Sequence, residues 1–169
     1  NCFPILFFPD VQKYLKRLRD RLFTQLCKQF NYKRSKLTKD EKEKIRLEMS
    51  SLKVFYCGEY GPQSFRPHYH VLLFFDSQRI ANCITQVLCS AWKMGNCPFK
   101  WCDTSGACRY VSEYLNSVVG LPPLYKYHWN KAKSRHSIRI GVSEDKEFNK
   151  DIHEISFKSI TSEIVCRDG

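Results

Sequence analysis

The first half of the chain shows two hydrophobic periods, one typical of helices and one typical of strands. In residues 11–30 the apolar side chains recur at steps of three and four, which places them on one face of a helix: Val11, Tyr14, Leu15, Leu18, Leu22 and Leu26. Asp10 stands directly before this stretch, so we expect it to cap the helix. The pattern predicts an amphipathic helix with one buried stripe.

Residues 31–50 are dominated by charged side chains. Thr38 and Glu41 have the spacing of a capping box, in which each side chain pairs with the backbone N–H of the other residue. We therefore expect a second, exposed helix in a charged surface excursion spanning residues 31–50.

Two strand-like segments follow, separated by a turn. Residues 52–60 and 68–75 are rich in β-branched and aromatic side chains. Gly61, Pro62 and Pro67 mark the stretch between them as a turn. So short a connection predicts an antiparallel pair.

The remaining chain predicts helices and short strands. Residues 97–103 read as a short strand and residues 104–119 as a helix that stops at Gly120. Segments 134–141 and 154–161 add an edge strand. A third helix precedes them, capped by Asp76 or Ser77, and its inner face comprises Ile80, Ile84, Val87, Leu88, Ala91 and Trp92.

These elements predict one α+β domain over residues 1–169, with an antiparallel sheet, helices on one side of it, and a poorly defined tail at residues 143–169. The 28 lysines and arginines against 17 acids give a net charge of +11. Such a balance favours a polyanionic partner, nucleic acid before an anionic membrane, although a merely basic surface is the alternative. No apolar run reaches the roughly 18 residues of a membrane span.

The nine cysteines do not indicate a disulfide scaffold, because the count is odd, no pair has C-x-x-C spacing and the chain is large enough to bury a core. Cys97, Cys102 and Cys108 are the best candidates for a structural zinc site, but their spacing fits no common zinc module.

A metal site is also suggested by His68 and His70, which lie two residues apart on a predicted strand and so share a face. Neutral imidazole is a good ligand for divalent metals. Glu59 ends the preceding strand and can lie beside the histidines if the two strands pair. Two histidines and one glutamate leave open positions on a divalent ion, as catalytic sites require. The alternative is that both histidines are satisfied core residues.

Tyr110 and Tyr114 share one face of the predicted helix at residues 104–119. Both can be core residues. Alternatively, one or both hydroxyls attack a phosphodiester, helped by a metal that polarises the phosphate.

Several segments together resemble a known family: "CGEYGPQSFRPHYHVLLFF", "SAWKMGNC", "YVSEYLNS", "PDVQKYLKRLR" and "SRHSIRIG". They are similar to the replication initiators of microviruses, especially the branch carried as prophages by gut Bacteroidetes, over about residues 3–142. These initiators are HUH endonucleases, named for His-hydrophobic-His, which His68-Tyr69-His70 matches.

The resemblance implies a ferredoxin-like or RRM-like sheet with the HUH strand at its centre. It implies Mg²⁺ or Mn²⁺ on His68, His70 and Glu59, and Tyr114 and Tyr110 as nucleophiles. Such an enzyme nicks single-stranded DNA at the phage origin, keeps the 5′ end on tyrosine and frees a 3′-OH primer for rolling-circle synthesis. It works in the cytoplasm of the bacterial host, with a host helicase or polymerase as further partners. Backbone contacts to DNA are expected from Arg66, Lys93, Arg109 and Lys126.

Two departures from the family pattern stand out. Glu113 and Asn116 occupy places where related initiators carry a lysine, and "CFPILFF" does not match the family's upstream "TLTY" strand, so we expect a chain truncated at its N-terminus. The alternative function is a non-catalytic nucleic-acid binder on an RRM-like sheet, with Tyr56, Tyr69 and Phe55 stacking on bases. The chain has no RNP-like "GFGFV" run, which counts against it.

Overall fold

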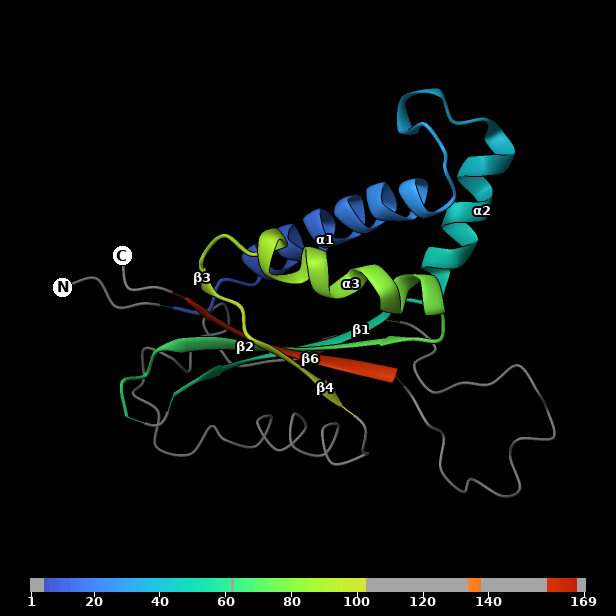
Figure 1. Ribbon diagram of the computed structural model, residues 1–169. Coiled ribbons are helices and arrows are strands. Elements are labelled where there is room, and N and C mark those ends of the chain that lie inside the picture. Colours follow the sequence, from blue (N-terminus) through green and yellow to red (C-terminus); the bar gives the residue numbers. More distant parts are fainter. Residues whose placement is uncertain (1–4, 62, 103–133, 138–157, 167–169) are drawn as a thin grey trace, which may run out of the picture.

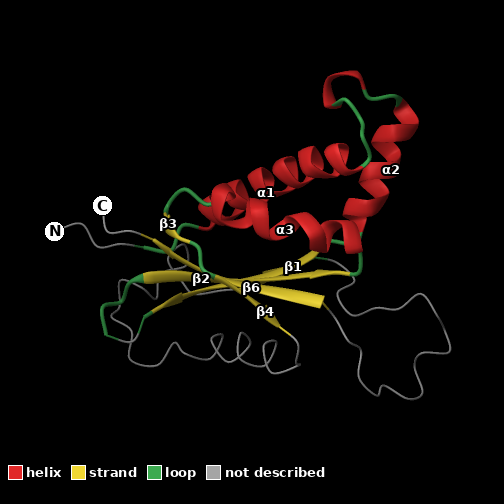
Figure 2. Ribbon diagram, viewed as in Figure 1, coloured by secondary structure: helices red, strands yellow, loops and turns green. Residues whose placement is uncertain are grey.

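The computed structural model describes residues 5–61, 63–102, 134–137 and 158–166 as helices and connections stacked on an antiparallel sheet (Figures 1 and 2). The strand order is β3-β6-β2-β1-β5, with β4 also paired to β6, and every pairing is antiparallel. This confirms the predicted α+β class. The strands are β1 (Lys53–Tyr60), β2 (Pro67–Phe75), β3 (Gly95–Asn96), β4 (Phe99–Cys102), β5 (Ser134–His136) and β6 (Lys158–Cys166).

The strand that carries both histidines, β2, lies at the centre of the sheet. It pairs with β1 along one side and with β6 along the other. Of the two segments expected to add an edge strand, the first forms β5 at the edge beside β1, whereas the second contributes to β6, an inner strand.

The first helix, α1 (Phe8–Gln29), buries the predicted apolar stripe. The expected cap at Asp10 is wrong. The helix begins two residues earlier, after Phe7, and no side chain caps it. Pro9 explains the earlier start, because its fixed φ suits the first helical turn. Asp10 lies in that turn, where a carboxylate is favoured by the helix dipole.

The C-terminus of α1 is closed by backbone hydrogen bonds. The Tyr32 N–H donates to the Cys27 carbonyl (2.8 Å) and the Asn31 N–H to the Lys28 carbonyl (3.0 Å), which is the Schellman pattern. Asn31 has φ = 56°, the left-handed conformation that this motif requires at its turning residue. The chain then reverses into the charged excursion.

That excursion contains α2 (Lys39–Ser50), which begins with the predicted capping box of Thr38 and Glu41. The Thr38 hydroxyl accepts from the Glu41 N–H (3.2 Å), and the Glu41 carboxylate accepts from the Thr38 N–H (2.7 Å). Ile45 is the buried residue of this helix. Figure 1 shows α2 beside the end of α1, standing away from the sheet.

The third helix, α3 (Gln78–Ala91), is capped by Ser77, whose hydroxyl accepts from the Ile80 N–H (3.1 Å). All six residues of its predicted inner face are buried. It packs beside α1 over the sheet, and the Arg17 Nε of α1 donates to the carbonyl of Ala91 at the end of α3 (2.7 Å). No helix in the described part of the chain is long and apolar enough to cross a bilayer.

The two faces of the sheet differ in what they carry. Tyr69, Val71, Leu73 and Phe75 of β2 join the main core beneath α1 and α3. The alternate positions face the other way, where Leu72 packs with buried Cys57 of β1 and with half-buried Phe55 and Phe74. His68 and His70 therefore lie on the face opposite the helices.

Candidate metal centre

The β1–β2 hairpin brings Glu59 and both histidines to one face of the sheet. Its register places Glu59 opposite His68, and Cys57 opposite His70. Directly paired residues in an antiparallel ladder point to the same side, as do residues two apart on one strand. The sequence prediction that Glu59 lies beside the histidines is confirmed.

Glu59 and His70 are in contact. The His70 Nε2 atom lies 3.3 Å from the Glu59 Oε2 atom, and the two residues are only 6% and 9% exposed. The contact does not have hydrogen-bond geometry, because Glu59 Oε2 has no hydrogen-bond partner. Buried polar atoms are normally paired. Neighbouring ligand atoms around an octahedral Mg²⁺ lie about 3 Å apart, so these two atoms are spaced to share one ion.

His68 is on the same face but is held apart by its surroundings. Its ring lies against Gly61 in the turn, where a Cβ would be 3.1 Å from His68 Cε1. Its Nδ1 atom is buried without a hydrogen-bond partner. Across residues 5–61, 63–102, 134–137 and 158–166, no three His, Cys, Asp or Glu side chains are placed to hold a metal ion together. The contact of two donors, Glu59 and His70, is therefore formed, with His68 nearby.

The surroundings of this pair are apolar. Cys57, opposite His70, is fully buried, and this burial together with the Glu59 carboxylate raises the pKa of its thiol to about 12. The thiol therefore stays protonated at neutral pH and acts as a small hydrophobic group rather than a thiolate ligand. Charges beside such a surface interact strongly because little water screens them.

The middle residue of the motif, Tyr69, anchors the strand from the other side. Its hydroxyl accepts from the Phe7 N–H (2.6 Å), and its ring meets Phe8 and Trp92 edge to face. In the neighbouring strand, the Tyr60 hydroxyl accepts from the Leu6 N–H (2.9 Å). Both strands that carry the candidate ligands are thus fastened to the segment before α1.

Burial also corrects the alternative function. Tyr56 and Tyr69 were expected to stack on bases, but they are only 8% and 1% exposed and belong to the core beneath the helices. Phe55, the third stacking candidate, is half-buried on the opposite face. Three aromatic residues split between two faces cannot form one stacking platform.

Comparison with known proteins places the chain in a family. Residues 9–118 match the model of a family of replication-associated proteins, described by its member ORF2. The chain belongs to this family. No curated protein and no solved structure matches it significantly. The part matched to the replication-associated family contains Glu59, His68 and His70, and it extends through Tyr110 and Tyr114. Membership confirms the expected relationship to replication initiators.

Several predicted residues of this replication-associated protein lie outside the described residues: Tyr110, Tyr114, Arg109, Lys126 and Cys108. Of the expected DNA contacts that are described, Arg66 is half-buried just before β2, and Lys93 is exposed just after α3. Cys97 and Cys102 are free thiols, the first buried and the second partly buried.

Sequence reasoning missed two neighbours of the site. Gly61 lies against the His68 ring, and its signal was available, since glycine in a turn beside a functional residue often permits close approach. The register of β6 places Glu163 opposite His70. That pairing left no local signal because β6 is far from β2 in the chain.

Proposed function

We propose that this protein initiates rolling-circle replication by nicking single-stranded origin DNA in a metal-dependent reaction of the HUH type. The observation that carries the proposal is the contact of Glu59 with His70, on the same sheet face as His68, in a replication-associated protein. Its net charge of +11 supports a nucleic-acid substrate.

Glu59, His68 and His70 are the residues that would hold Mg²⁺ or Mn²⁺. One carboxylate and two imidazoles suit such an ion, and the unpartnered atoms Glu59 Oε2 and His68 Nδ1 have capacity for it. His68 would join the other two by turning its ring away from Gly61. When bound, the ion polarises the scissile phosphate and neutralises charge that develops on its oxygens.

The nucleophile in this proposal is Tyr114, with Tyr110 as the second. The phenolic oxygen of one tyrosine attacks the phosphorus and forms a P–O bond, while the bond between phosphorus and the 3′ oxygen breaks. The phenol proton ends on the departing 3′ oxygen. One phosphodiester replaces another, so the step needs no oxidant or nucleotide cofactor. The second tyrosine would accept the DNA end at termination.

The backbone of the DNA would be held by Arg66, Lys93, Arg109 and Lys126. The 3′-OH released by the nick would prime synthesis by a host polymerase, with a host helicase opening the duplex, in the bacterial cytoplasm. The lysine that related initiators place near the tyrosines is replaced here by Glu113 and Asn116. These flanking cations would therefore supply the neutralising charge.

The test is covalent capture of DNA. The full chain is incubated with Mn²⁺ and a randomised pool of single-stranded DNA that carries a 3′ fluorophore, and products are separated on a denaturing gel. We expect a protein–DNA adduct whose sequenced DNA defines the origin. Tyr114→Phe should abolish it, whereas Tyr32→Phe, a matched control in a half-buried tyrosine stacked on Phe30, should not. An adduct that survives in Tyr110→Phe/Tyr114→Phe would refute the assignment of the nucleophiles.

Metal binding is measured separately from nicking. Mn²⁺ affinity, followed by the electron paramagnetic resonance of free Mn²⁺, should fall at least tenfold in His70→Gln, on the scale seen when metal-site residues are lost. His136→Gln is the matched control because His136 is exposed on β5. Equal affinity in both variants would exclude His70 as a ligand.

A further inference from the structure

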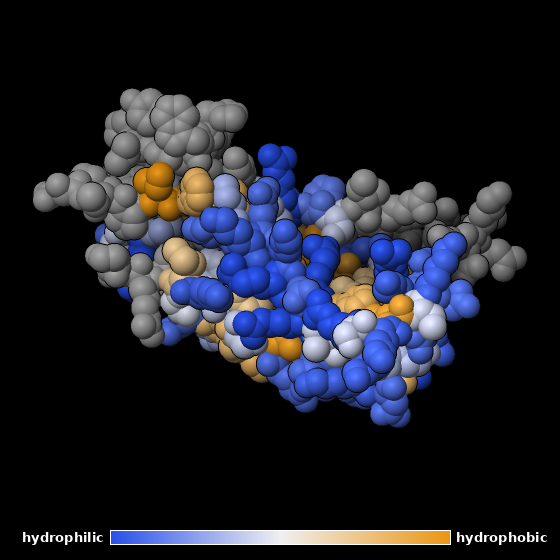
Figure 3. All heavy atoms as spheres, turned by 90° about the horizontal axis from the view of Figure 1, so that it is seen from above, coloured by the Kyte–Doolittle hydropathy of each residue, from blue (hydrophilic) through white to orange (hydrophobic). Residues whose placement is uncertain are grey.

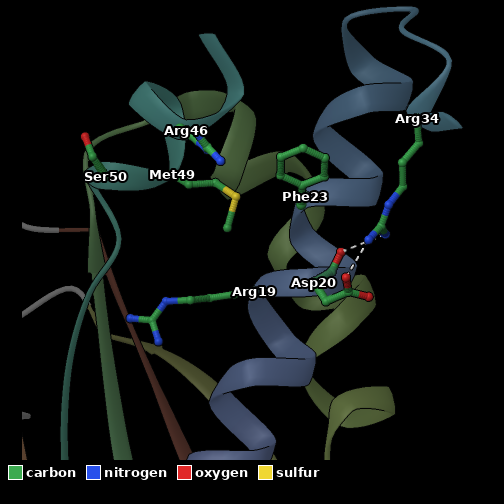
Figure 4. A pocket seen from close by; sticks show the side chains of 7 residues that line it. All are labelled: Arg19, Asp20, Phe23, Arg34, Arg46, Met49 and Ser50. Carbon is green, nitrogen blue, oxygen red and sulfur yellow. Dashed lines mark hydrogen bonds and ion pairs between the residues drawn. The ribbon is translucent and has the colours of Figure 1, made fainter. Parts of the chain in front are cut away.

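A groove lies between α1 and α2, in the helical layer rather than on the sheet face that carries Glu59 and the histidines. Its volume is about 460 Å³, and three arginines line it: Arg19, Arg34 and Arg46. Phe23 and Met49 form its apolar part, and Figure 4 shows their side chains reaching toward each other from the two helices. The groove therefore combines cations with an apolar surface.

The three arginines differ in how far they are already engaged. Arg34 is fixed, because its guanidinium pairs with Asp20 and lies 5.5 Å from the centroid of the Phe23 ring. Arg19 has no ion-pair or hydrogen-bond partner among the residues that the structure describes. Arg46 reaches Glu43 at 3.7 Å, but the two side chains are 71% and 73% exposed, and such surface pairs contribute little. Arg19 and Arg46 are therefore available to bind an anion.

The surrounding charge favours a polyanion. Residues 8–50 contain 13 lysines and arginines and six acids, so this part carries +7 of the net charge of +11. Seen from the helical side, the surface is largely hydrophilic with small apolar patches (Figure 3). A concentration of positive charge of this kind attracts a phosphate backbone.

We propose that the groove is a second contact for single-stranded DNA, separate from the nicking site. A base lies against Phe23, Met49 and the flat face of Arg34, while Arg19 and Arg46 bind the adjoining phosphates. Single-strand binders combine these two contacts, base stacking and phosphate pairing. A duplex keeps its bases stacked inside and would leave the apolar surface unused. The proposal rests on the proposed function, since both require DNA, but it concerns a flanking segment and not the scissile phosphate.

The test compares two double variants of equal charge. Arg19→Gln/Arg46→Gln removes the groove cations, and Lys13→Gln/Lys39→Gln removes two exposed cations of the same helices that do not line the groove. Binding of a labelled oligothymidylate of about 20 nucleotides is followed by fluorescence anisotropy between about 50 and 200 mM salt. Losing two phosphate contacts should lower the slope of log K against log salt by about 1.4 in the groove variant. The control should keep the wild-type slope.

A third variant tests the apolar surface, and a duplex of equal length tests the preference. Met49→Ala should weaken binding of the single strand and leave duplex binding unchanged. Equal losses in the groove variant and the lysine control would overturn the proposal, as would a loss confined to duplex DNA. The wild-type adduct assay separates the two proposals. If the adduct forms but the groove variant matches its control, only the groove proposal fails; if wild type neither binds nor reacts, both fail.

Discussion

Replacing Tyr69 with phenylalanine should cost stability without touching the chemistry, although Tyr69 stands between the two candidate metal ligands. The change keeps the ring, with its contacts to Phe8 and Trp92, and removes the hydroxyl that accepts from the Phe7 N–H. A buried donor left without its acceptor costs about 1–3 kcal/mol. Phe7 is 49% exposed, so water can partly replace the lost partner, and we expect about 1 kcal/mol.

Tyr60→Phe provides the comparison on the neighbouring strand. Its hydroxyl accepts from the N–H of Leu6, which is only 1% exposed, so water cannot replace it and the cost should approach the upper part of the same range. For a chain of this size, each 1 kcal/mol lowers the melting temperature by about 2–4 °C. Thermal unfolding followed by circular dichroism should therefore rank wild type above Tyr69→Phe, and Tyr69→Phe above Tyr60→Phe.

The same variants should retain Mn²⁺ affinity and DNA adduct formation below their melting temperatures, because both hydroxyls lie on the helical side of the sheet. Loss of Mn²⁺ binding or of the adduct in a folded Tyr69→Phe protein would mean that this hydroxyl reaches the site. That outcome would refute the assignment of the two sheet faces.

Three further predictions concern the turn, the first helix and the thiols. Gly61→Ala should weaken Mn²⁺ binding in the resonance assay, since a methyl group there would press on the His68 ring, and unchanged affinity would count against His68 as a ligand. Asn31→Gly should raise the free energy of unfolding in urea by up to about 1 kcal/mol, because glycine adopts the left-handed conformation without strain; a decrease would contradict this. Iodoacetamide at about pH 8 should label exposed Cys89 well before Cys83, because burial raises the pKa of the Cys83 thiol to about 11; peptide mass spectrometry gives the order, and equal labelling would be inconsistent with the packing of α3.

Features that depend on near neighbours in the chain were predictable. The Thr38–Glu41 box needs only a spacing of three residues, and it is present. The pairing of Glu59 with His68 follows from a short turn, which permits few registers for the hairpin. These local constraints brought the candidate ligands to one face before any long-range contact was considered.

The errors arose where two local readings competed or where a face had to be chosen. Asp10 is a good capping residue, but Pro9 starts the helix earlier. The orientation of Tyr69 was predicted correctly relative to the histidines, yet nothing in the apolar run Val71–Phe75 indicates which face the helices cover. Docking of α1 and α3 decides that, and it buries Tyr56 and Tyr69.

Long-range features were beyond the sequence. The arginine groove depends on how α2 stands against α1 after the turn at Asn31, and no spacing in the sequence specifies that arrangement. The nucleophilic roles of Tyr110 and Tyr114 stay predictions.

The position of β6 beside β2 has a consequence for the order in which the protein is made. During synthesis the β1–β2 hairpin can form early, but β2 gains its second neighbour only after residues 158–166 have left the ribosome. Until then the strand that carries both histidines presents an unpaired apolar edge, which invites aggregation. Chains that stop before residue 158 should therefore depend on chaperones and be degraded quickly. A cell would then hold few partly made copies of a protein proposed to cut DNA.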